Sequence, residues 1–154
     1  MDLHIARRLA LSLMAENGLL GWKFRFDRSR RRFGCCNHGR KRISLSAVLT
    51  RLNELKDVQD TIAHEVAHAL TPGKGHGRVW KRKAVQLGAS PERCFDGTVN
   101  MPEPTFLGTC PSCGKSVKRF RRSRVACREC CEKHNEGRYS EDYRIVFRRI
   151  PRKP

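Results

Sequence analysis

The sequence predicts an α+β protein in which helices and a short antiparallel sheet form a core, followed by a small β-rich module. Three observations predict it: helical apolar periodicity over much of the first hundred residues, short runs that alternate apolar with basic residues, and paired cysteines near the C-terminus. With 154 residues, the chain can bury one modest core beside a module that needs its own cross-link. We expect a core over 1–100, the cysteine module with a return strand over 101–150, and a basic tail over 151–154.

The first elements follow from capping residues and alternation. Asp2 is a suitable N-cap for a helix that extends to Asn17, where a glycine follows. The segment Trp22–Phe26 alternates apolar and basic side chains, as a half-buried strand does. The charged residues 27–32 indicate a turn, and a second strand fits Lys41–Leu45. This second strand pairs either with the first strand or with a later one.

Helical periodicity returns after the second strand. It covers Ser46–Leu52 and then continues from about Val58 to Leu70. The sequence Thr71-Pro72-Gly73 ends that helix, because proline cannot continue a helix and glycine permits a reversal of the chain. A further helix fits Gly77–Leu87, and the residues from Ala89 to Pro104 have the composition of a linker.

The helix that ends at Leu70 carries a metal-ligand pattern, His64-Glu65-Val66-Ala67-His68. Residues four apart lie on the same face of a helix, so His64 and His68 can bind one ion. Glu65 lies beside that face, where it can act as a general base without being a ligand. Apolar residues occupy the opposite arc and anchor the helix in the core. The pattern predicts a catalytic zinc site.

A catalytic zinc usually has three protein ligands, and the third must come from outside this helix. His76 lies between two glycines after a short turn that can return the chain to the metal. Glu92 is the rival, at a workable distance along the chain but in a polar, proline-containing loop. We favour His76. The pattern with a glycine and a third histidine at fixed offsets is excluded, because Thr71 and Lys74 stand at those positions.

A second metal site is predicted in the C-terminal module. Two Cys-x-x-Cys pairs are typical of a closed, tetrahedral zinc ribbon, which folds a segment too small to hold itself. The four candidate ligands are Cys110, Cys113, Cys127 and Cys130. Cys131 can replace Cys130 after a local shift, so the fourth ligand stays open. An alternating strand, Tyr143–Phe147, follows the module.

The remaining cysteines and histidines have no comparable context. For the cysteines, an ordinary role as small buried or surface thiols is favoured over a third metal site. The histidines fit ordinary surface or hydrogen-bonded roles. These residues are Cys35, Cys36 and Cys94, and His4, His38 and His134.

The chain is strongly basic, with 33 Lys and Arg against 15 Asp and Glu and a formal net charge of +18. Such an excess attracts polyanions, so nucleic acid is the first partner to expect. Three acid-free basic runs stand out, at 28–42, 74–83 and 115–128. An aromatic residue within such a run can stack on an unpaired base. The candidate contacts are Arg30, Arg31, Arg32, Lys118, Arg119, Phe120, Arg121, Arg122 and Arg124.

With these residues laid out, the chain resembles the SprT-like family, which includes the Spartan-type proteases of DNA–protein crosslinks. The matching features are Trp22–Phe26, Phe33-Gly34, Ile43–Ser46, the His-Glu-x-x-His at 64–68, Gly75-His76-Gly77 followed by Trp80, and the four ribbon cysteines. The resemblance implies a zincin-like metalloprotease core with His64, His68 and His76 on zinc and Glu65 as base. It also implies a ribbon that helps to bind DNA, and it strengthens the preference for His76 over Glu92.

We therefore expect a zinc metalloendopeptidase, a hydrolase with one catalytic and one structural zinc ion. Its expected role is DNA repair, by cleavage of DNA-bound or DNA-crosslinked proteins on single-stranded or junction DNA without sequence specificity. One alternative is a non-catalytic, zinc-stabilised nucleic-acid-binding or regulatory protein, and another is an RNA-binding or ribosome-associated protein. The longest uncharged apolar run near the start, Leu9–Ala15, is too short to span a bilayer. We expect a monomer without membrane attachment, cytoplasmic and nucleoid-associated, or in the host cytoplasm if the source is viral.

Overall fold

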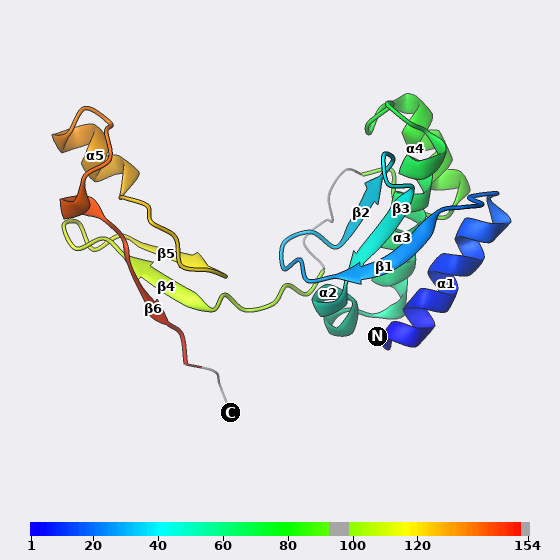
Figure 1. Cartoon of the computed structure of the whole chain (residues 1–154), viewed down its shortest axis with the longest axis horizontal. Helices are drawn as coiled ribbons and strands as arrows, with labels where there is room; N and C mark the ends of the chain where they lie inside the picture. The colour runs from blue at the N-terminus through cyan, green and yellow to red at the C-terminus, as the bar shows by residue number, and fades with distance from the viewer. Residues whose placement is uncertain (93–98, 152–154) are drawn as a thin grey trace. The chain divides into compact units, whose positions relative to one another are not determined.

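The computed structural model describes residues 1–92 and 99–151. Contacts divide the chain into two compact units, Met1–Pro102 and Glu103–Pro154. Both units combine helices with a three-stranded sheet, which confirms the α+β class (Figure 1). Cys94 lies outside the described residues, and so does the predicted basic tail except for Pro151. Among the described residues, no helix is long and apolar enough to cross a membrane.

The first unit consists of four helices and three strands. In chain order these are α1 (Leu3–Glu16), β1 (Lys23–Asp27), β2 (Gly34–Asn37), β3 (Arg42–Ser46), α2 (Ala47–Leu52), α3 (Leu55–Leu70) and α4 (Arg78–Gln86). Helix α1 begins as expected, since Asp2 Oδ1 accepts hydrogen bonds from the backbone N–H groups of His4 and Ile5 at 2.8 and 3.1 Å. The predicted helices thus match α1 to α4 to within a few residues.

The sheet of this unit is mixed, so the prediction of a purely antiparallel sheet was wrong. Its strand order is β1-β3-β2, in which β3 pairs parallel with β1 and antiparallel with β2. Strand β2 was not predicted, because Gly34-Cys35-Cys36-Asn37 lacks alternation of apolar and polar residues. Its presence explains the direction of β3: the chain reverses once before β2 and once after it, so β1 and β3 point the same way.

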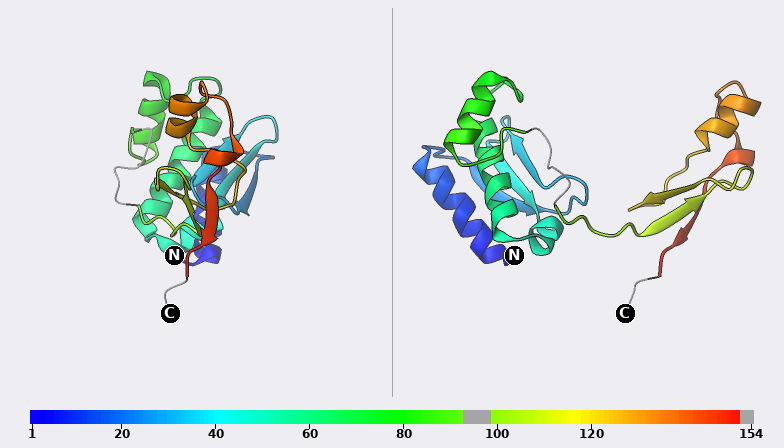
Figure 2. Two further views of the ribbon diagram at one scale, coloured as in Figure 1. Left: turned by 90° about the vertical axis from the view of Figure 1, so that its left-hand side faces the viewer. Right: turned by 180° about the vertical axis from the view of Figure 1, so that it is seen from behind.

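Helices α1 and α3 cover one face of this sheet (Figure 2). Helix α3 contributes Val58, Ile62 and Val66, each at most 1% exposed, to the main core. They pack with Ala6 and Ala10 of α1 and with apolar residues of the strands. The apolar residues predicted opposite His64 and His68 therefore anchor the helix in the core. The face that carries the two histidines is consequently turned away from this core.

Helix α4 packs against a second face of α3. Ala63 and Ala67 of α3 form a small cluster with Trp80 and Ala84 of α4. Two alanines one turn apart leave space for an indole ring, and Trp80 is 0% exposed. This arrangement brings Trp80 to the same side of α3 as the histidines.

The second unit contains β4 (Phe106–Thr109), β5 (Ser116–Arg119), α5 (Arg128–His134), a 3₁₀ turn (Glu141–Tyr143) and β6 (Val146–Arg149). Its sheet has the order β5-β4-β6 and is antiparallel throughout. The strand predicted from Tyr143 begins three residues later, because Tyr143 lies in the 3₁₀ turn that Ser140 caps. Gly108 of β4 leaves room for β6, since a Cβ there would lie 2.6 Å from atoms of Ile145 and Phe147.

Candidate metal centres

Three imidazoles converge in the first unit. The Nε2 atoms of His64 and His68 are 3.2 Å apart, those of His68 and His76 are 3.1 Å apart, and those of His64 and His76 are 3.3 Å apart. Two of these side chains come from adjacent turns of α3 and the third from the loop before α4. Among the described residues, this trio is one of two groups of three or more His, Cys, Asp or Glu side chains that can hold a metal ion.

The geometry of the trio fits zinc. Tetrahedral zinc with Zn–N bonds of about 2.0–2.1 Å requires ligand nitrogens about 3.3–3.4 Å apart, close to the spacing found here. Burial and the neighbouring histidines also lower the pKa of His64 and of His68 to about 4. Both imidazoles are therefore neutral near pH 7, which is the form that binds a metal.

A compact turn brings His76 back to α3. Thr71 ends the helix, and its Oγ1 donates to the carbonyl of Ala67 at 2.8 Å. Gly73 and Gly75 then adopt φ angles of +73° and +51°, which residues with a side chain rarely adopt. The structure thus places His76 at the other two histidines. Glu92 is exposed and lines the same cleft without joining the metal-binding group.

The indole ring of Trp80 packs against all three imidazoles. Its ring centroid lies 4.7, 5.1 and 4.5 Å from those of His64, His68 and His76. It stacks on His68 at 27° and meets the other two rings edge to face. Its buried Nε1 has no hydrogen-bond partner among the described residues. Packing against Trp80 restricts the ring orientation of every candidate ligand, a role that sequence reasoning missed.

Glu65 lies beside this cluster and is held by strand β2. Its side chain is 7% exposed, and burial raises its pKa to about 7, although Arg32 and a hydrogen bond from the backbone of Cys36 oppose the rise. A Cβ atom on Gly34 would lie only 2.5 Å from Glu65 Oε1. Glycine at this position therefore makes room for the carboxylate. The one signal in the sequence for this close approach was a glycine at the start of an extended segment.

The histidines and Glu65 open into a cleft of about 1150 Å³. It is lined from one side by β2 and the segment before it, including Arg31, Arg32 and Cys36, and from the other by α3 and the loop that holds His76. A volume of this size accommodates a segment of peptide. The arrangement combines a metal-binding trio, a buried carboxylate and an accessible cavity.

Residues 7–100 match the model of the SprT-like family, which is more than half of the chain and includes the three histidines and Glu65. The chain belongs to the SprT-like family. This membership indicates a metallopeptidase-type domain in the first unit. A search of curated proteins finds no match to the chain.

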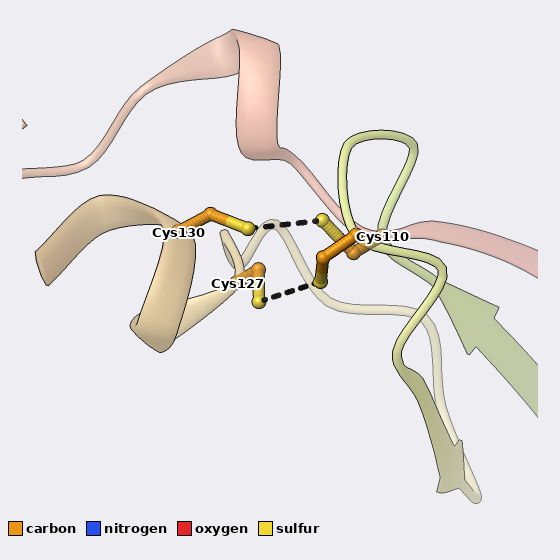
Figure 3. A group of neighbouring side chains, drawn as sticks. Cys110, Cys127 and Cys130 are labelled. Atoms are coloured by element: carbon orange, nitrogen blue, oxygen red, sulfur yellow. Dashed lines mark hydrogen bonds between the residues drawn. The ribbon is translucent and has the colours of Figure 1, made fainter. Parts of the chain in front are cut away.

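A second metal-binding group lies beyond the SprT-like match, in the second unit (Figure 3). The Sγ atoms of Cys110 and Cys130 are 3.8 Å apart, and those of Cys113 and Cys127 are 3.7 Å apart. Zinc–sulfur bonds of about 2.3 Å in a tetrahedron require sulfurs about 3.8 Å apart, so the spacing fits a zinc ribbon. Burial opposes ionisation of Cys110, but backbone N–H groups of Cys113 and Ser112 lower its pKa to about 7. They stabilise the thiolate that binds a metal.

Cys130 and Cys131 have different places at this group. Both lie in α5 and both are buried, but only Cys130 belongs to the group of four sulfurs. The backbone of Cys131 has a different role. Its carbonyl accepts a hydrogen bond from the backbone N–H of Gly137 at 2.9 Å, which closes the turn after α5. The geometry of this unit of the SprT-like protein thus favours Cys130 over Cys131.

The candidate nucleic-acid contacts fall in both units of the SprT-like protein. Arg31 and Arg32 line the cleft, and Arg32 forms a salt bridge with Asp27 at 2.8 Å. In the second unit, the contacts occupy β5 and the loop after it, and the basic ones are exposed while Phe120 is half-buried. They are Lys118, Arg119, Phe120, Arg121, Arg122 and Arg124.

Two of these arginines already have partners within the unit. Arg124 forms a salt bridge with Glu141 and lies 5.9 Å from the centroid of the Tyr139 ring. Arg122 lies over the ring of Phe106 at 5.3 Å. Such contacts hold a guanidinium at a fixed place on the surface, where it can still face a phosphate.

Proposed function

We propose that the protein is a zinc-dependent endopeptidase with a zincin-like core, in which the His-Glu-x-x-His pattern and His76 form the active site. The observation that carries the proposal is the convergence of three imidazole Nε2 atoms, 3.1–3.3 Å apart, beside the buried carboxylate of Glu65 in an open cleft. Catalytic zinc sites in proteins have three ligands and an open fourth position. A purely structural zinc site has four protein ligands, and the trio has no fourth among the described residues.

In this proposal the residues of the site have separate roles. His64, His68 and His76 hold the ion as neutral ligands, with Trp80 fixing their orientation. A zinc ion held there would polarise the scissile carbonyl and lower the pKa of a water molecule. Glu65 takes the proton from the attacking water and delivers it to the leaving amine.

We further propose that the substrates are proteins bound or crosslinked to DNA, and that the action belongs to DNA repair. The net charge of +18 and the exposed cations of β5 and the loop after it support this part of the proposal. A polyanion that binds both enzyme and substrate raises their local concentration. Binding to phosphates through Lys and Arg is independent of sequence, as expected for an enzyme that acts at any crosslink.

The main alternative is a non-catalytic protein in which both zinc ions only stabilise DNA-binding units. It is favoured by the same basic surface and by the closed group of four sulfurs. The two functions differ at Glu65, which the alternative does not need. A zinc count of two per chain fits both and does not separate them.

The test is cleavage of a basic DNA-binding protein, with and without single-stranded DNA, by the wild type and by Glu65→Gln. Glutamine keeps the size of the side chain and its bond to the backbone of Cys36 but cannot take a proton. We expect cleavage by the wild type in the presence of DNA, and at least a 100-fold loss in the variant with zinc content unchanged. If neither protein cleaves while both bind DNA equally, the alternative holds. A preference for RNA over DNA contradicts the proposed substrate class.

A further inference from the structure

Cys36 and His38 lie close together at the cleft, outside the metal centres described above. The distance from Cys36 Sγ to His38 Nε2 is 3.7 Å. Both residues line the cleft that contains the three histidines. Sequence reasoning assigned both residues ordinary roles, because neither has the context of a metal-ligand pattern.

The hairpin between β2 and β3 fixes both side chains. Cys36 pairs with Ile43 across the two strands. His38 begins the connecting turn, where its carbonyl accepts a hydrogen bond from Lys41 at 3.0 Å. The edge of the Trp22 ring packs against the His38 imidazole, with the centroids 5.5 Å apart and the planes at 85°. The pair is therefore held by a turn, a strand pairing and a ring contact.

The separation of the two donor atoms fits a metal ion. Tetrahedral zinc with bonds of about 2.3 Å to sulfur and about 2.0–2.1 Å to nitrogen requires these atoms about 3.6 Å apart. Thiol and imidazole are also the two ligand types that zinc and cadmium prefer. One cation can thus bind both side chains without rearrangement of the hairpin, and the thiol releases its proton to solvent as the ion binds.

The surroundings of Cys36 favour a cation over a redox role. The thiol lies in the field of the Glu65 carboxylate, and the backbone of Cys36 donates a hydrogen bond to that carboxylate. Burial, Glu65 and Cys35 raise the pKa of the Cys36 thiol to about 12, so it is a poor nucleophile and a poor target for oxidation, and a cation that binds it must displace the thiol proton. A cation at the same place is attracted by the negative charge of Glu65.

We propose that Cys36 and His38 form a second, inhibitory site for a thiophilic divalent cation, occupied when zinc is in excess. Two protein ligands bind more weakly than the three imidazoles, so the site fills only after the catalytic one. A cation there lies beside Glu65 and attracts its carboxylate, which removes the base from catalysis. The inhibition rests on the function proposed above, whereas the binding itself does not.

The test uses the full chain loaded with two zinc ions and cadmium as the added probe. Native mass spectrometry counts zinc and cadmium separately as cadmium is titrated, and peptidase activity is measured at increasing excess zinc. The variants are Cys36→Ser and His38→Asn. The matched control is Cys35→Ser, which changes the neighbouring thiol of the same strand, whose Sγ contacts the carbonyl of Cys36 instead.

We expect one cadmium beyond the two zinc ions in the wild type and in Cys35→Ser, with at least a tenfold weaker affinity in Cys36→Ser and His38→Asn. Excess zinc should inhibit the wild type and Cys35→Ser, and should inhibit the other two variants at least tenfold less. The proposal is overturned if the wild type takes up no third ion, or if Cys36→Ser binds it like Cys35→Ser. If the third ion binds as expected but no variant cleaves any substrate, the cation site stands and the proposed peptidase function fails.

Discussion

At the scale of single residues, the absence of a side chain at Gly34 is as important to the site as the presence of one at Glu65. The carboxylate occupies the volume that a Cβ atom of residue 34 would take, with 2.5 Å to Oε1 and 2.6 Å to Cγ. The backbone of Cys36, two residues further along β2, binds the same carboxylate. Strand β2 thus positions a side chain of α3, and a small change in the strand should affect the proposed catalysis.

The change Gly34→Ala tests this positioning. Alanine must push the Glu65 carboxylate away, and a displacement of about 1 Å can cost about 100-fold in rate. We expect kcat/KM for a peptide substrate to fall by about that factor, while zinc content stays at two per chain. The control is Gly39→Ala, whose Cβ meets only Asn37 Oδ1 at 3.8 Å. Equal activity of Gly34→Ala and the wild type contradicts a positioning role.

At the scale of elements, Asp27 connects the end of β1 with β3 and with the segment that leads to β2. Its carboxylate accepts hydrogen bonds from the backbone N–H of Ser29 at 2.9 Å, the hydroxyl of Ser44 at 3.0 Å and the guanidinium of Arg32 at 2.8 Å. Burial opposes ionisation, but these three partners together hold the pKa of Asp27 below its ordinary value of 3.8. The charged form therefore stabilises the junction.

The change Asp27→Asn tests this junction through its pH dependence. A carboxyl whose pKa is lower in the folded state contributes stability above its unfolded pKa, and this contribution is lost as the pH falls through the folded value. We expect the variant to lose about 1 kcal/mol of unfolding free energy at pH 7. The difference from the wild type should close below pH 3.8. Urea denaturation of both proteins at several pH values measures it, and a difference independent of pH contradicts the role of the charge.

The group of four cysteines in the second unit permits a separate test of its fourth metal ligand. Cys130 lies within 3.8 Å of Cys110, whereas Cys131 is outside the group of four sulfurs although it is also buried. We expect Cys130→Ser to contain one zinc ion per chain and Cys131→Ser to retain two, as counted by native mass spectrometry. Retention of two ions in Cys130→Ser means that Cys131 takes its place after a shift of α5.

At the scale of the whole molecule, charge is the dominant property. The formal net charge of +18 is spread over both units, in the cleft as well as on β5 and the loop after it. In the proposed function this charge gathers enzyme and DNA-bound substrate on one polyanion. Release of counterions from the phosphates then makes binding strongly dependent on salt.

Salt dependence measures how many cations take part. For single-stranded DNA, we expect log K to fall by about 0.7 per phosphate contact for each unit of log salt concentration. The change Arg119→Ala removes one candidate phosphate contact, so the slope should become shallower by about the 0.7 that one contact contributes. The control is Arg128→Ala, since Arg128 pairs with Glu132 one turn along α5 at 2.7 Å. Fluorescence anisotropy at several salt concentrations gives the slopes, and equal slopes for Arg119→Ala and the wild type exclude Arg119 from the interface.

The sequence by itself determined the features that depend on local spacing. The helix that carries His64 and His68, the turn that ends it and the two Cys-x-x-Cys pairs follow from periodicity, from proline and glycine, and from ligand offsets. It also determined the charge of the chain. Each of these features involves residues only a few positions apart, whose relation the backbone geometry alone sets.

Only the tertiary structure decided the features that depend on distant residues. The parallel pairing of β1 with β3 depends on a strand without a recognisable pattern. The space for Glu65 depends on Gly34, the orientation of the imidazoles depends on Trp80, and the contact of Cys36 with His38 depends on the hairpin that positions them. These relations arise from packing between elements, where the available volume and the direction of each side chain are set by the whole core rather than by neighbours in the sequence.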